Sequence, residues 1–331
     1  MRPAFLKGIK LERHELADLL AADLAGVESV MERSLRSEVP YIQELNEGVL
    51  DSQGKRLRPA LLILAAGRPG ESGDDVLLCA AVVEMIHAAS LLHDDVVDRG
   101  LRRRGRPTLN AEHGDGPAIL MGDYVYTRAL TLLVDAGLME VFGLLARAVH
   151  RLSVGELLQL ELKQRRILDE DAYRRVIYEK TARLIEATCR AGGILGGRPA
   201  GEVETLAAFG RELGMAFQIV DDMLDYDADA LRLGKPVGRD LAEGKRTLPL
   251  LKAWAAAPPD RRDRLAELLG DGGENRLAII ELVRDLGGLE AAHAEAVRYG
   301  ERSRRALADL PASPVRAALD ASVDFVVARR F

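Results

Sequence analysis

The sequence contains few aromatic residues and few cysteines, and it has no excess of basic residues. Phe, Trp and Tyr make up 4% of 331 residues, so a core must consist mainly of aliphatic side chains. The two cysteines, Cys79 and Cys189, lie in apolar surroundings without a CxxC pattern. This predicts buried thiols in a reducing compartment. A net charge of −6 argues against a general nucleic-acid binder.

Long apolar runs and targeting signals are also missing. No uninterrupted apolar run reaches the ~18 residues that a helix needs to cross a bilayer. The first residues, MRPAFLKGIKLERHE, lack the apolar core of a signal peptide. We therefore predict a soluble, cytoplasmic protein without a transmembrane segment.

Strand patterns are absent as well, because no segment shows period-two alternation bounded by turn residues. Apolar residues instead recur every three or four positions, and turn-forming clusters separate these segments. No fixed-period repeat or low-complexity linker divides the chain, so we predict one all-α domain over residues 1–331. Helices are predicted over 11–35, 56–67, 74–98, 117–135, 138–168, 170–193, 202–226, 246–256, 260–270, 275–286, 288–309 and 314–329.

Two of these helices end in the same acidic pattern, DDxxD. In the first, SLLHDDVVD, Asp94 and Asp98 lie four residues apart and project from one helix face, close to His87. In the second, FQIVDDMLDY, Gln218, Asp221 and Asp225 share a face. Paired acids on a helix usually mean a solvated surface, and a single short motif is weak evidence.

A repeated motif at these positions favours a bound cation. Carboxylates repel each other at this spacing, and the helix dipole disfavours negative charge near a C-terminal end. Mg²⁺ prefers oxygen ligands and shares its shell with phosphates, so acids facing each other across a cleft could hold several ions and a diphosphate. A di-iron site would need two Glu-x-x-His pairs, and only Glu84 and His87 form one near the motifs.

Three basic clusters accompany the acids: GKRLRP at 54–59, RRRGRPT at 102–108 and LGKPVGRDLAEGKRT at 233–247. Each alone is most simply a solvated surface. Guanidinium groups match phosphate oxygens in pairs, however, so the first two clusters fit a second diphosphate bound without metal. The third could close over the metal-bound phosphate.

These motifs, in this order, resemble those of trans-isoprenyl diphosphate synthases of the polyprenyl synthetase family over essentially the whole chain. Further matches are HAASLLHDDVVD, GDY at 122–124, KT at 180–181 and GKPVGRDLAEGKRTLPL. The resemblance implies a bundle of long antiparallel helices around a central cavity, in a homodimer. It implies Mg²⁺-dependent head-to-tail condensation of isopentenyl diphosphate with an allylic diphosphate, by ionisation, condensation and elimination.

The resemblance also implies residue roles. The Mg²⁺ ligands would be chiefly Asp94, Asp98 and Asp221, supported by Asp95, Asp222 and Asp225. Isopentenyl diphosphate would be bound by Lys55, Arg58, His87 and Arg104. The allylic diphosphate would be bound by Arg103, Lys180, Lys235 and Lys245, with Thr181 and Gln218 near the reacting carbons.

Small residues near the first motif favour a long-chain polyprenyl product. Ser90 lies ~6 Å along the helix from Asp94, and by resemblance Ala89 also lines the tunnel, where short-chain relatives tend to carry an aromatic residue. Gly214 is small too, and the first motif lacks the two-residue insertion of bacterial farnesyl-type enzymes. Gln159 stands where short-chain members often have an aspartate ligand, so we exclude it from the metal ligands. These small residues could instead only allow close helix packing.

Several alternatives stay open. A bulky residue deeper in the tunnel would give a short-chain farnesyl or geranylgeranyl diphosphate synthase. A class I terpene cyclase or a head-to-head coupling enzyme needs an aromatic pocket, which the composition disfavours, and does not need the GKRLRP and RRG clusters. A non-catalytic partner subunit would be expected to have lost one DDxxD motif, and this chain has both. The sequence leaves the allylic starter and the downstream pathway undetermined.

Overall fold

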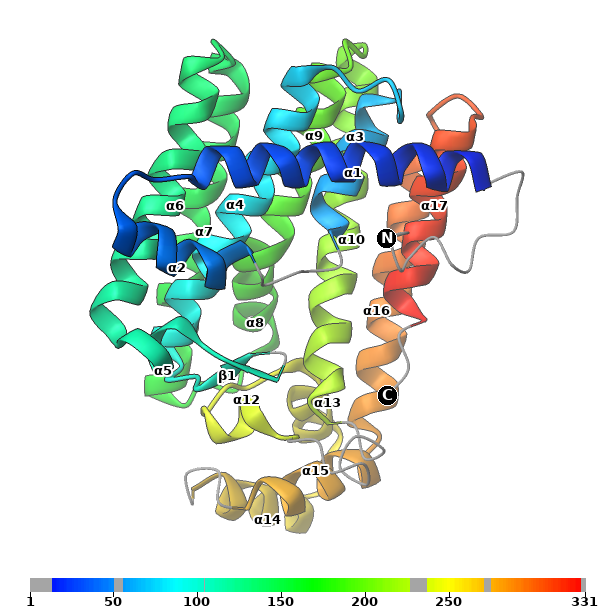
Figure 1. The fold of residues 1–331 in the computed structure, drawn as a ribbon. Coiled ribbons are helices and arrows are strands. Elements are labelled where there is room, and N and C mark those ends of the chain that lie inside the picture. Colours follow the sequence, from blue (N-terminus) through cyan, green and yellow to red (C-terminus); the bar gives the residue numbers. More distant parts are fainter. Residues whose placement is uncertain (1–13, 51–55, 104, 227–236, 271–274, 329–331) are drawn as a thin grey trace. The chain divides into compact units, whose positions relative to one another are not determined.

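The computed structural model describes residues 14–50, 56–103, 105–226, 237–270 and 275–328, and these are almost entirely helical, which confirms the all-α class (Figure 1). The helices before residue 166 are α1 (His14–Leu35), α2 (Pro40–Leu50), α3 (Leu57–Ala66), α4 (Asp74–Val97), α5 (Leu109–His113), α6 (Asp115–Asp135) and α7 (Met139–Arg165). Those after it are α8 (Glu170–Ile177), the π-helical turn η2 (Tyr178–Ala182), α9 (Arg183–Leu195), α10 (Ala200–Leu224), α12 (Arg239–Ala242), α13 (Leu248–Ala256), α14 (Pro259–Gly270), α15 (Arg276–Asp285), α16 (Gly288–Leu307) and α17 (Pro314–Val327).

The long helices follow the predicted ranges, and the differences are short elements. Helices α2, α5 and α12 were not predicted, since few turns give little periodic signal. The absence of strands was also wrong in one place. Strands β1 (Arg102–Arg103) and β2 (Arg106–Pro107) pair in an antiparallel hairpin. Two residues per strand are too few to show alternation.

Contacts divide the chain into two compact units, whose boundaries fall within α7, α9, α10 and α17 and between α16 and α17. The first comprises Met1–Val149, Ala187–Ala207 and Leu310–Ala321, and the second His150–Glu186, Ala208–Asp309 and Ser322–Phe331. The single domain expected over 1–331 stays a prediction.

In the first unit, α4 packs against α1, α3 and α6 (Figure 1). By length and composition α4 could cross a membrane, but 67% of its most apolar window is buried, as expected of a core helix. The neighbouring α3 approaches α9 closely at two glycines. A Cβ atom on Gly192 would lie 2.4 Å from the carbonyl oxygen of Leu62, and one on Gly196 would lie 2.2 Å from that of Ala66. Any larger residue would separate these helices.

In the second unit, a mainly aliphatic core forms around α13, α14 and α15. Tyr226 is its largest side chain, fully buried with its hydroxyl 3.1 Å from Thr247 Oγ1. Helix α16 begins against α13, where a Cβ atom on Gly288 would lie 2.3 Å from the carbonyl oxygen of Pro249. This core supports the segment that follows the second DDxxD motif.

Cys79 and Cys189 are both fully buried, and the two form no disulfide, as the sequence predicts. Burial, and to a smaller extent the charge of Asp75, raises the pKa of Cys79 to about 12. We expect neither thiol of the native protein to react with an aromatic disulfide reagent at pH 8, and both to react in denaturant, because the thiolate is the nucleophile. Absorbance of the released thiolate measures this. Fast reaction of one thiol without denaturant would contradict the packing of α4 or α9.

Candidate active site

The first DDxxD motif sits where α4 ends and the chain turns back. Arg99 adopts the left-handed conformation, and the N–H of Gly100 donates to the carbonyl of Asp95, which closes a Schellman motif. The β1–β2 hairpin then returns Arg103 to Asp95. Its Nε lies 3.0 Å from Oδ2 and its Nη2 lies 2.9 Å from Oδ1.

This fork distinguishes the middle aspartate from its neighbours. Asp95 is buried, whereas Asp94 and Asp98 are partly exposed. Asn110 fastens the same corner, since its Nδ2 lies 3.3 Å from the carbonyl oxygen of Asp95. Arg103, predicted to bind the allylic diphosphate, is here the partner of Asp95. The arrangement assigns Asp95 to the structure of the corner and leaves Asp94 and Asp98 reachable from solvent.

The basic cluster GKRLRP at the start of α3 also contains a residue with a structural role, Arg56. Arg56 Nη1 donates to Glu84 Oε1 at 3.0 Å, and its Nε lies 3.5 Å from Glu28. Arg56 therefore ties the start of α3 to α4 and α1, and Glu84 is occupied as an ion-pair partner. Arg58 and His87 are partly exposed in the same unit. The predicted residues Lys55 and Arg104 lie outside the described residues.

The second DDxxD motif has the same division between its first and middle acids. Asp221 is exposed, whereas Asp222 is buried. Tyr173 on α8 donates its hydroxyl to Asp222 Oδ2 at 2.6 Å, and Gln218 donates Nε2 to Oδ1 at 2.7 Å. Thr181 in η2 donates in turn to Gln218 Oε1 at 2.7 Å. A continuous hydrogen-bond chain thus runs from Tyr173 through Asp222 and Gln218 to Thr181.

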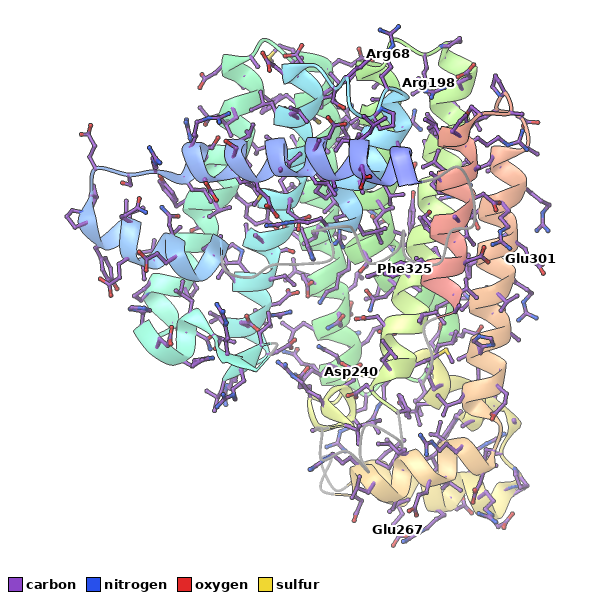
Figure 2. The ribbon with its side chains drawn as sticks, turned by 45° about the vertical axis from the view of Figure 1, so that its right-hand side comes forward. Arg68, Arg198, Asp240, Glu267, Glu301 and Phe325 are labelled. Carbon is purple, nitrogen blue, oxygen red and sulfur yellow. The ribbon has the colours of Figure 1, made fainter. Side chains whose placement is uncertain are left out.

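Asp225, the last acid of the second motif, folds the segment that follows it. Its carboxylate accepts the backbone N–H groups of Arg239 at 3.0 Å and Asp240 at 2.8 Å, which begin the short helix α12. Figure 2 labels Asp240 on this helix. Lys245 lies 2.7 Å from Glu243 and 3.7 Å from Asp240.

Burial, together with neighbouring negative charge, raises the pKa of two acids at the second motif. Burial raises the pKa of Asp222 to about 7, and the charge of Asp221 adds to this, although hydrogen bonds from Tyr173 and Gln218 oppose it. Burial followed by the charge of Asp222 raises the pKa of Asp240. Protein cations therefore compensate these carboxyl groups only in part. A bound cation would complete the compensation.

Lys180 and its partner lie in the second unit too. Lys180 Nζ is 2.6 Å from Glu156 Oε1 on α7, one helical turn before Gln159. The predicted Lys235 lies outside the described residues. Sequence reasoning missed Glu156 and Tyr173 as partners of site residues. The acidic GELLQLELKQ segment around Gln159 was the available signal for Glu156, and no local pattern marks Tyr173.

The donor chemistry of both motifs fits Mg²⁺, because carboxylate oxygens are its preferred protein ligands. Across the described ranges, no group of three or more His, Cys, Asp or Glu side chains is assembled to hold a metal ion. A Mg²⁺ ion at either motif would therefore complete its shell with phosphate oxygens and water, which is usual for this ion. That the two motifs face each other stays a prediction.

The small residues considered for product length divide into two kinds. A Cβ atom on Gly214 would lie 2.5 Å from Cα of Ala182, so this glycine allows α10 to pack on η2, and its bearing on product length stays a prediction. Ala89 is fully buried and Ser90 nearly so. The Ser90 hydroxyl donates to the carbonyl of His87 in its own helix.

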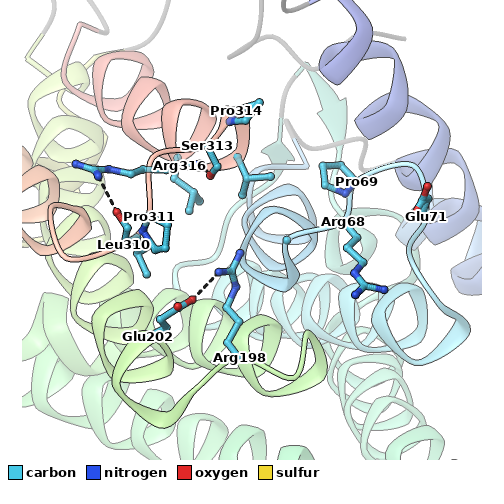
Figure 3. Close-up of a pocket in the computed structure, with 13 residues that line it drawn as sticks. Arg68, Pro69, Glu71, Arg198, Glu202, Leu310, Pro311, Ser313, Pro314 and Arg316 are labelled. Carbon is cyan, nitrogen blue, oxygen red and sulfur yellow. Dashed lines mark hydrogen bonds and ion pairs between the residues drawn. The ribbon is translucent and has the colours of Figure 1, made fainter.

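A separate pocket of about 490 Å³ lies in the first unit, between the α3–α4 loop and the start of α17 (Figure 3). Arg198 lines it and is bound to Glu202 at 2.7 Å and to the carbonyl of Ala65. Arg316 donates to the carbonyl of Leu310. None of the predicted site residues lines this pocket.

Comparison with known proteins identifies the family and several relatives of this chain. The polyprenyl synthetase family model matches residues 39–286. The octaprenyl diphosphate synthase of Escherichia coli (strain K12) is 40% identical over 307 residues, covering 92% of this chain and 95% of that enzyme. A decaprenyl diphosphate synthase structure from Rhodobacter capsulatus aligns with a TM-score of 0.89 at 40% identity, over 96% of this chain and 99% of that chain. A polyprenyl synthase from Caulobacter crescentus CB15, complexed with calcium and isoprenyl diphosphate, has a TM-score of 0.88 and 37% identity, over 96% and 97%.

The Arg103–Asp95 fork should stabilise the first unit. Arg103→Ala leaves the buried Asp95 without its cation, and we expect the free energy of unfolding to fall by about 2 kcal/mol. Arg102→Ala is the matched control, because Arg102 is exposed and donates to the carbonyl of Gly105 within the hairpin. It should change the free energy of unfolding by less than about 0.5 kcal/mol. Urea denaturation measures both, and equal losses would show that the fork is not stabilising.

Proposed function

The chain belongs to the polyprenyl synthetase family, and from this premise we propose the reaction that it catalyses and the residues that carry it out. The protein is a prenyltransferase of isoprenoid biosynthesis. Its substrates are isopentenyl diphosphate and an allylic prenyl diphosphate, joined head to tail into a long-chain all-trans polyprenyl diphosphate. Two relatives that support the long chain are named octaprenyl and decaprenyl diphosphate synthase.

One structural observation carries the assignment of the site. In each DDxxD motif the middle aspartate is buried and hydrogen-bonded to the protein, whereas the first aspartate is partly exposed (Asp94) or exposed (Asp221). Two motifs whose first aspartates are accessible to solvent are suited to bind ligands from solution. The calcium and isoprenyl diphosphate in the Caulobacter crescentus CB15 polyprenyl synthase support a divalent cation with a diphosphate here.

We assign Asp94, Asp98 and Asp221 as the principal Mg²⁺ ligands, with Asp95, Asp222 and Asp225 supporting them. When bound, Mg²⁺ neutralises charge on the allylic diphosphate as its C–O bond breaks. Lys180, Lys245, Lys235 and Arg103 contribute further positive charge to the departing diphosphate, which is the charge that develops in the transition state. When the substrate binds, Lys180 would exchange its ion pair with Glu156 for one with the diphosphate.

The remaining residues hold the second substrate and the reacting carbons. Lys55, Arg58, His87 and Arg104 would bind isopentenyl diphosphate by charge-assisted hydrogen bonds. Thr181 and Gln218, fixed by the chain to Asp222, would present their oxygens to the allylic cation and orient it toward the double bond. None of these residues is assigned as the base, so we propose that the departing diphosphate accepts the final proton.

A homodimer and a cytoplasmic location complete the proposal, on the resemblance of the chain to its family. Gel filtration with light scattering tests the first, and cell fractionation tests the second.

The function is tested with purified protein, Mg²⁺, isopentenyl diphosphate and farnesyl or geranylgeranyl diphosphate, followed by mass analysis of the dephosphorylated alcohols. A ladder that ends at a long polyprenol supports the proposal, and chelation with EDTA should stop it. Products that stop at farnesol or geranylgeraniol would make the protein a short-chain synthase. No elongation with any starter would favour a cyclase or a non-catalytic subunit.

Asp221→Ala should lower kcat by ~10²-fold or more, because it removes a carboxylate assigned to the metal-bound diphosphate. Asp260→Ala is the matched control, since Asp260 is also an exposed aspartate of the second unit but begins α14. Its kcat should stay within about twofold of wild type, as expected for a surface position. Steady-state incorporation of labelled isopentenyl diphosphate measures both. Equal activity of the two variants would remove Asp221 from the site.

Ser90→Phe should shorten the product by several isoprene units, because a ring one turn before Asp94 would occupy the path assigned to the growing chain. Ser29→Phe on α1 adds the same ring elsewhere in the first unit and should leave the product length unchanged. Mass spectrometry of the alcohols gives the length, and circular dichroism confirms folding. A folded Ser90→Phe enzyme that makes wild-type products would contradict the tunnel assignment.

A further inference from the structure

The segment with Lys180 and Thr181 is not a regular α-helix. Between α8 and α9 the chain forms the π-helical turn η2, Tyr178–Ala182. Such turns are rare in proteins overall, and those that do occur are often found at functional sites. A local departure from α-helical geometry persists only where neighbouring groups stabilise it, and two sets of groups stabilise this one.

The first such group is a buried ion cluster around Glu179, within η2. Glu179 is 4% exposed and accepts hydrogen bonds from Arg151 Nε at 2.9 Å and Arg183 Nε at 2.7 Å. Arg183 also lies 4.5 Å above the ring of Tyr178. Burial raises the pKa of Glu179, but hydrogen bonds from the two arginines outweigh it, and the pKa lies below its ordinary value. Glu179 is thus an ionised carboxylate with two cations.

Two glycines form the second support. A Cβ atom on Gly155 of α7 would lie 2.6 Å from the backbone nitrogen of Lys180. A Cβ atom on Gly214 of α10 would lie 2.5 Å from Cα of Ala182. Both distances are shorter than any side chain tolerates, so α7 and α10 approach the backbone of the turn only because these residues lack a Cβ.

Near each of these glycines, the same helix also contacts a predicted site residue of the turn. Next to Gly155, Glu156 on α7 binds Lys180. One turn after Gly214, Gln218 on α10 accepts the hydroxyl of Thr181. The position of the turn therefore sets where both side chains lie, and Glu179 lies beside them in sequence but points to different partners.

We propose that Glu179, held between Arg151 and Arg183, is a positioning residue that fixes η2 and thereby sets the geometry of Lys180 and Thr181 for prenyl transfer. Glu179 itself touches neither substrate. The inference rests on the proposed function for the roles of Lys180 and Thr181, and it adds residues that no sequence motif of the site contains.

The second unit offers a closely matched control. Glu295 on α16 is 5% exposed, lies 3.3 Å from Arg174 and accepts hydrogen bonds from Arg298. It is therefore also a buried glutamate with two arginines. Neither Arg174 nor Arg298 is a predicted site residue.

The test compares Glu179→Gln with Glu295→Gln. Both variants should lose thermal stability. Glu179→Gln should also lower kcat at least ~10-fold and raise KM for the allylic substrate, because displaced groups lose productive geometry. KM for isopentenyl diphosphate should stay unchanged, since its assigned residues all belong to the first unit. Glu295→Gln should leave kcat and both KM values within about twofold of wild type.

Hydrogen exchange of the 178–182 segment provides a readout that needs no substrate. Exchange there should be faster in Glu179→Gln than in wild type or Glu295→Gln. If wild type fails to condense the substrates, the proposed function is wrong even when exchange responds. If wild type is active and Glu179→Gln matches Glu295→Gln in kinetics and exchange, the positioning role is overturned.

Glycine variants test the same device when Glu179→Gln does not fold. Gly155→Ala should displace the turn and reproduce the loss of kcat with unchanged KM for isopentenyl diphosphate. Gly288→Ala, at the α16–α13 contact of the same unit, should affect stability alone. Identical kinetics of these two variants would also overturn the proposal.

Discussion

The structure depends on holding carboxylates near the C-terminal ends of apolar helices, where desolvation, mutual repulsion and the helix dipole all oppose their charge. Folding meets this cost within each motif by burying one acid with dedicated hydrogen-bond donors. Asp95 receives the guanidinium of Arg103, and Asp222 receives the hydroxyl of Tyr173 and the amide of Gln218. The buried acid then fixes the helix end from which its neighbours reach solvent.

The two motifs stabilise their buried aspartates with different kinds of partner. A guanidinium brings a full positive charge to Asp95. The hydrogen-bond partners of Asp222 are neutral, and burial raises its pKa to about 7. A cation bound at the second motif would favour the ionised form of Asp222. Asp225 uses a third solution, because it accepts two backbone N–H groups and so begins the next helical turn.

Periodicity and motif spacing predicted the long helices and the candidate acids, because both signals are local. Contacts between distant positions were not predictable in this way. Tyr173 and Asp222 are 49 residues apart, and nothing in the local pattern pairs them. Arg103 was predicted only as a phosphate ligand, since its return to Asp95 needs a hairpin whose strands are too short to recognise. Gly214 was noted only as a small residue, and its close approach to Ala182 shows that it also allows helix packing.

Local sequence patterns also do not predict the geometry of Lys180 and Thr181. Adjacent residues acquire a defined geometry only when the backbone that carries them is fixed, and η2 departs from the regular helix at that point. The groups against it, Arg151 and Gly155 on α7 among them, come from elsewhere in the chain. Since a π-helical turn has no intrinsic preference over an α-helix, these tertiary contacts must supply its stability. A Lys-Thr dipeptide in a sequence is thus not sufficient for the site, because its geometry is encoded in the residues that surround the turn.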